Sequence, residues 1–119
     1  MTWTPPTIIL SAREKAEAQR IKALLEACNY DLDLWCSKLG YELRIVHEAM
    51  FTAPVVASMR GKKLYVVRTL LKEQMIEAIA HEHCHATFHA ECVSYEELHE
   101  FTAGHDEGHA IAFEREVLG

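Results

Sequence analysis

The sequence predicts one α+β domain, in which helices precede and follow a small three-stranded sheet. Three observations favour this class. A helix start signal lies at Ser11 and Glu14, the hydrophobic period changes to two after Gly40, and a helical pattern resumes at Lys72. A chain of 119 residues is long enough for one hydrophobic core. No linker or internal repeat divides it, so a single domain over 1–119 is expected.

The first part of the chain is expected to form the scaffold. Ser11 and Glu14 make a capping-box pattern, in which each side chain can bond the backbone of the other residue, so a helix should begin at Ala12. Residues 29–31 should bend or break it. A second helix is expected over Leu32–Leu39, where leucine, tryptophan and cysteine recur at helical spacing before a glycine.

The next part is expected to form the sheet. Leu43 and Ile45 alternate with polar residues, which predicts a strand. Two more strands are expected over 54–59 and 64–67, joined by a turn at 60–63. The second strand begins with a proline, which has no backbone N–H to donate to a neighbour, so its start is expected at an edge of the sheet.

Residues 81–85 (HEHCH) carry the most informative chemistry of the sequence. They lie in an apolar-periodic stretch over about 72–92, which predicts a helix. His81 and His85 are four positions apart and would leave the same helix face about one turn apart. Two such imidazoles suit a tetrahedral Zn²⁺, and Glu82 beside them can reach a metal-bound water. The stretch is the H-E-x-x-H pattern, which predicts a zinc site with Glu82 as general base.

Histidine pairs at this spacing also arise by chance, since the chain has eight histidines and His85 forms another pair with His89. Two features favour a metal site: residues 75–80 form the strong helix that the motif requires, and candidate third ligands follow downstream. Cys84 and His83 point to other parts of the helix wheel. We expect both to pack in the interior, His83 with a hydrogen-bond partner.

The third ligand is expected in the last part of the chain. A short helix over about 94–101 and a final helix over about 105–118 are predicted there. His109, Glu107 and His105 are its candidate ligands. His109 and Glu107 are two positions apart, so their side chains diverge by about 200° on a helix and cannot both face one metal. We expect His109, because the preceding glycine allows a close backbone approach and a neutral imidazole adds no charge to an acidic segment.

Residues 81–86 (HEHCHA) and 107–113 (EGHAIAF) together resemble the SprT-like zinc metalloproteases, in which HExxH is followed by a GH…F segment whose histidine completes the site. The resemblance implies a zincin-like fold and hydrolysis of peptide bonds by a zinc-activated water. Carried over, the metal ligands are His81, His85 and His109. Glu82 would be the general base, and Phe113 would pack the helix of the third ligand against the core.

A second resemblance is to the ImmA/IrrE-like peptidases, in which an Ala-His-Glu…His helix follows a strand similar to residues 63–67. Their third ligand is a glutamate, and Glu107 matches it. This resemblance implies a peptidase that cleaves a repressor or another regulator. The non-enzymatic alternative is a zinc-binding module, in which a fourth protein ligand such as His105, His89 or Cys84 would close the metal shell, whereas an open water position favours an enzyme.

Charge and composition restrict the partners. The formal net charge of −6 argues against a general nucleic-acid binder, whose footprint is basic. From Glu73 onward there are eleven acidic residues and one basic residue, an imbalance that a bound dication would partly compensate. SprT-like proteins often carry a C-terminal zinc ribbon for nucleic acid, and the residues after Val117 are too few to form one. A minimal peptidase core acting on a protein or peptide is therefore expected.

A cytoplasmic location is expected as well. The sequence has no apolar stretch of about 20 residues and no signal-peptide pattern at its start. Its four cysteines form no C-x-x-C pair and are expected to be reduced, mostly buried thiols.

Overall fold

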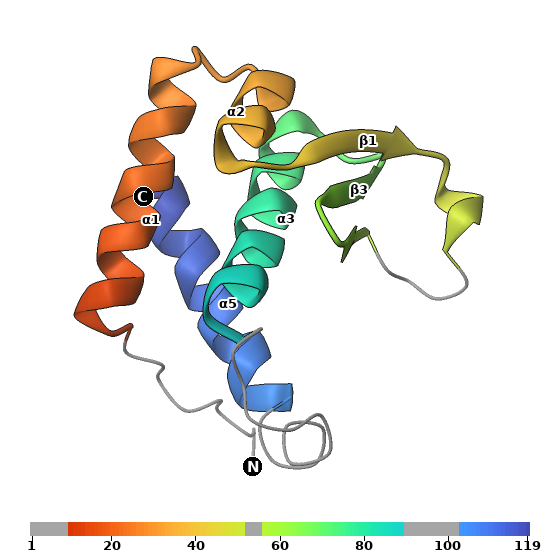
Figure 1. The fold of residues 1–119 in the computed structure, drawn as a ribbon. Coiled ribbons are helices and arrows are strands. Elements are labelled where there is room, and N and C mark those ends of the chain that lie inside the picture. Colours follow the sequence, from red (N-terminus) through yellow and green to blue (C-terminus); the bar gives the residue numbers. More distant parts are fainter. Residues whose placement is uncertain (1–9, 52–55, 90–102) are drawn as a thin grey trace.

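The computed structural model contains a three-stranded sheet, with two helices before it in the chain and two long helices after it (Figure 1). It describes residues 10–51, 56–89 and 103–119, and for residues 50, 89 and 103–109 it describes the backbone alone. The elements are α1 (Ala12–Ala27), α2 (Leu32–Leu39), β1 (Glu42–Val46), β2 (Ala57–Arg60), β3 (Lys63–Val67), α3 (Lys72–Cys84) and α5 (Ala103–Leu118). A 3₁₀ turn at Glu48–Met50 follows β1, and a π-helical turn at His85–His89 follows α3. The α+β class is confirmed.

Local sequence signals set both N-terminal helices as predicted. The backbone N–H of Glu14 donates to Ser11 Oγ at 3.1 Å, and the backbone N–H of Ser11 donates to Glu14 Oε1 at 3.0 Å, which completes the capping box. Asn29 and Tyr30 take positive φ angles of 54° and 61° and separate α1 from α2. Gly40 ends α2 with a φ of 91°, a conformation that L-residues with a side chain rarely adopt.

The sheet has the order β1-β3-β2, with β3 parallel to β1 and antiparallel to β2. The hairpin turn between β2 and β3 lies at Gly61, inside the predicted turn, and β2 is an edge strand as expected. Ile45, one of the two apolar residues whose alternation predicted this strand, is 48% exposed. The reason is that α3 packs on β2 and β3, and β1 lies at the far edge, next to α2. The proline-led start of the second strand falls in 52–55, outside the described residues.

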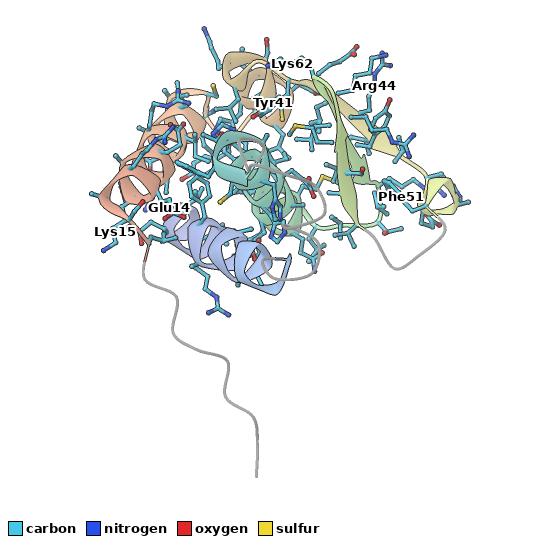
Figure 2. All side chains as sticks on the ribbon, turned by 60° about the horizontal axis from the view of Figure 1, so that its bottom comes forward. Glu14, Lys15, Tyr41, Arg44, Phe51 and Lys62 are labelled. Carbon is cyan, nitrogen blue, oxygen red and sulfur yellow. The ribbon has the colours of Figure 1, made fainter. Side chains whose placement is uncertain are left out.

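Helix α3 lies at the centre of the molecule. It packs against β2 and β3 on one side and against α5 on the other, and α5 in turn contacts α1 (Figure 1). The side chains between these elements form one core, while Arg44 and Lys62 extend outward from the sheet (Figure 2). The largest fully buried side chains are Trp35, Phe113, Ile21, Leu64, Ile79 and Val66. The predicted packing of Phe113 in the core is confirmed.

Two boundaries differ from those expected. The α-helix of the metal motif ends at Cys84 and continues as the π-helical turn, and α5 begins at Ala103, two residues before the predicted start. The predicted short helix at 94–101 lies outside the described residues. Cys28, Cys36 and Cys84 are buried free thiols, as expected. None of the described helices is both long enough and apolar enough to cross a bilayer.

Candidate metal site

His81, near the end of α3, and His85, the first residue of the π-helical turn, lie side by side, as their spacing predicts. Their Nε2 atoms are 3.2 Å apart, and the ring planes are inclined by 64°. Two imidazole nitrogens bound to one tetrahedral Zn²⁺ at about 2.0–2.1 Å would lie about 3.3 Å from each other. The two rings therefore already have the separation that a shared metal ion requires.

Glu114 contacts the other nitrogen of His81. Its Oε2 atom lies 3.0 Å from His81 Nδ1, and both side chains are 19% exposed. Glu114 comes from α5, 33 positions along the chain. The sequence pattern led to no prediction for Glu114. Its spacing could have indicated a partly buried carboxylate, because Glu114 lies four positions after Ala110 and directly after Phe113, at the border of the buried face of α5.

Glu82 is half-buried and lines two neighbouring hollows. The larger one has a volume of about 520 Å³ and lies between α3, β2 and α5, with His81 and Glu114 in its wall. The smaller one has a volume of about 280 Å³ and includes His85. Edge strand β2 borders both, through Ala57 in the larger and Met59 in the smaller. The candidate base thus lies beside the histidine pair, in a cleft that follows an edge strand.

The third ligand stays a prediction. The backbone of His109, Glu107 and His105 lies in α5, but their side chains are outside the described part of the structure. Among the described residues, no group of three or more histidine, cysteine, aspartate or glutamate side chains could hold a metal ion. Within that part of the chain, His81 and His85 are two of the three predicted ligands. Cys84, one of the proposed closing ligands, is fully buried in the core.

His83 lies on the opposite side of α3 in a buried polar cluster. It is 4% exposed; Nδ1 lies 2.7 Å from the Tyr41 hydroxyl, and Nε2 lies 3.2 Å from Glu17 Oε1 and 3.3 Å from Thr87 Oγ1. Burial lowers the pKa of His83, which keeps the ring neutral. Burial alone would raise the pKa of Glu17, but hydrogen bonds from Arg20 and His83 outweigh it and lower that pKa. The prediction of a packed, hydrogen-bonded histidine is confirmed.

These charge states fix the hydrogens of the cluster. An ionised Glu17 only accepts hydrogen bonds, so the one ring hydrogen of neutral His83 belongs on Nε2. Nδ1 then carries a lone pair and accepts from the Tyr41 hydroxyl, whose pKa is raised by burial. The cluster thus joins α1, α3 and the segment before β1 through hydrogen bonds.

Comparisons with models of protein families, with curated proteins and with solved structures found no match for this chain.

Proposed function

We propose that the chain is a zinc-dependent metallopeptidase with a zincin-like fold, most similar in its ligand pattern to the SprT-like enzymes. One observation carries the proposal: the Nε2 atoms of His81 and His85 face each other at 3.2 Å beside a cleft that Glu82 also lines. His109 on α5 would complete the ligand set. Three protein ligands would leave the fourth position of a tetrahedral zinc to water, as in catalytic rather than closed structural sites.

Each residue of the site has a distinct task in this mechanism. Zn²⁺ held by His81, His85 and His109 would supply a Lewis acid and lower the pKa of a coordinated water to about 7. Glu82 takes a proton from the attacking water and transfers it to the leaving nitrogen of the substrate. Because Glu82 lines both hollows, we expect its carboxylate to lie beside a peptide bond bound in this cleft.

The edge strand offers a binding mode for an extended peptide. The backbone N–H of Val67 donates to the oxygen of Val56 at 3.0 Å. In an antiparallel ladder the backbone groups alternate in direction, so those of Ala57 and Met59 point away from β3, toward an edge that no strand of the described residues pairs with. A peptide that pairs with this edge as an added strand would pass both hollows and lie over Glu82. The proposed substrate is therefore an extended segment of a protein or peptide.

Zinc content and one isosteric substitution test the proposal. Purified protein should hold about one zinc per chain, and chelation should lower its unfolding midpoint, because a ligand at 100 times its dissociation constant stabilises the native state by about 2.7 kcal/mol. Glu82→Gln should keep zinc and lose cleavage of labelled casein, since an amide cannot accept the proton of the water. Glu77→Gln is the matched control, because it removes a carboxylate from the same cavity and helix. Absence of zinc, or wild-type cleavage by Glu82→Gln, would contradict the mechanism.

A pair of alanine variants tests the third ligand. His109→Ala should weaken zinc binding sharply and Glu107→Ala should leave it nearly unchanged. The reverse result would favour the ImmA/IrrE-like ligand set and a regulatory substrate. Tight zinc binding without any cleavage, together with no loss in either variant, would favour the non-catalytic zinc-binding module.

A further inference from the structure

We infer that Glu114 is a positioning residue, which fixes the tautomer of His81 and directs its Nε2 lone pair toward the metal position. The inference rests on the proposed zinc site and adds a residue to it that belongs to neither predicted ligand set. It also assigns a chemical task to the contact between α3 and α5.

The two nitrogens of His81 have different partners. Nδ1 lies 3.0 Å from a carboxylate oxygen of Glu114, and Nε2 lies 3.2 Å from Nε2 of His85. A neutral imidazole carries one ring hydrogen, and an ionised carboxylate only accepts. The hydrogen therefore belongs on Nδ1, where it is donated to Glu114, and Nε2 is left with the lone pair that a metal ligand needs.

Glu114 is held firmly enough to perform this task. The neighbouring Phe113 is fully buried, and Ala110 and Val117 anchor the same face of α5 in the core. Phe113 also packs beside His83 on α3, with ring centroids 6.2 Å apart, so the two helices are fixed to each other next to the Glu114–His81 contact. With only 19% of each side chain exposed, the contact is partly shielded from water, which strengthens a hydrogen bond to a charged group.

Two other roles for Glu114 give different expectations. If Glu114 bound the metal directly, its carboxylate would have to lie near Nε2 of His81. It contacts Nδ1 instead, whereas Nε2 lies beside His85. As a simple ion pair between helices it would support the fold, and its loss would lower stability without changing the tautomer of His81. A positioning role predicts changes in the tautomer and in zinc affinity.

The experiment compares Glu114→Ala, Glu114→Gln and Glu116→Gln. Glu116 lies on the same helix and accepts a hydrogen bond from Gln19 at 3.0 Å, so its substitution removes a similar charge away from His81. Zinc affinity is measured by competition with a chromophoric chelator. The tautomer of His81 is read from ring ¹⁵N shifts of the zinc-free proteins.

Glu114→Ala should bind zinc about 10–100-fold more weakly than wild type, the usual effect of losing such an outer partner, and should show a mixture of His81 tautomers. Glu114→Gln should lie between the two, because its amide oxygen can accept the same N–H. Glu116→Gln should match wild type. If Glu114→Ala aggregates, the Gln variant decides, since it keeps the side-chain shape.

Wild-type affinity and an unchanged His81 tautomer in both Glu114 variants would overturn the positioning role alone. A wild-type protein that binds no zinc would overturn the proposed function, and the inference with it.

Discussion

Replacing Tyr41 by phenylalanine tests the buried polar cluster on the side of α3 that faces the core. The substitution removes one hydroxyl, which lies 2.7 Å from His83 Nδ1 (Figure 2 shows the place of Tyr41). Since Glu17 holds the ring hydrogen of His83 on Nε2, the lone pair of Nδ1 depends on the Tyr41 hydroxyl. Tyr41→Phe would leave this acceptor buried and unpaired.

The expected cost follows from the burial of His83. Its side chain is 4% exposed, so water cannot easily replace the lost donor. Leaving a buried polar group without its partner costs about 1–3 kcal/mol. For 119 residues the entropy of unfolding is about 0.25 kcal/mol per degree, so the midpoint should fall by about 4–12 °C.

Thermal and urea unfolding of the zinc-free proteins measure this cost. Tyr65→Phe is the matched control, because Tyr65 is half-buried and its hydroxyl has no hydrogen bond to the described part of the chain. It should change stability by less than about 0.5 kcal/mol. In a His83→Leu background the effect of Tyr41→Phe should largely disappear, as expected for a direct pair. An equal cost in both backgrounds, or no cost in either, would refute the reasoning.

Three further substitutions or treatments probe the fold. Because folding lowers the pKa of Glu17, its carboxylate stabilises the native state above the ordinary value of about 4.5, and this stabilisation is lost as the pH falls through the lower pKa of the folded state. Glu17→Gln should therefore flatten the acid side of a plot of unfolding free energy against pH, measured with urea. An unchanged plot would contradict this. Phe113→Ala should lower the free energy of unfolding by about 3–5 kcal/mol, because it empties a fully buried aromatic site; a loss below about 1 kcal/mol in urea unfolding would show that the site collapses. Burial raises the pKa of Cys36 to about 12, so iodoacetamide should modify this thiol only after unfolding, and mass spectrometry that finds it alkylated in the native protein would show that it is accessible.

The features that the sequence predicts correctly depend on residues close together in the chain. The capping box at Ser11, the glycine stop at Gly40 and the pairing of His81 with His85 each involve positions at most four apart. Their geometry follows from the helix itself, so no knowledge of packing is needed.

The features that escaped prediction depend on packing. Glu114 reaches His81 across 33 positions, and Tyr41 and Glu17 reach His83 across 42 and 66 positions. The position of His83 on the helix wheel predicted a buried ring with a hydrogen-bond partner, but it could not identify that partner. The exposure of Ile45 has the same origin, since it depends on which strand α3 covers.

His81 and His83 are only two residues apart but have different roles. His83 forms hydrogen bonds in the core, and His81 belongs to the proposed metal site. His83 points about 200° away from His81 on the helix, so its hydrogen bonds lie in the core while His81 and His85 border the cleft. Substitutions should therefore fall into two groups. Tyr41→Phe should lower stability and leave zinc affinity within about twofold of wild type, since it removes no contact of His81 or His85. Glu114→Ala should weaken zinc binding more than it lowers stability. Measured side by side, a loss of zinc affinity in Tyr41→Phe as large as that in Glu114→Ala would show that the two faces of α3 act as one unit, and the separate tasks assigned to them would be wrong.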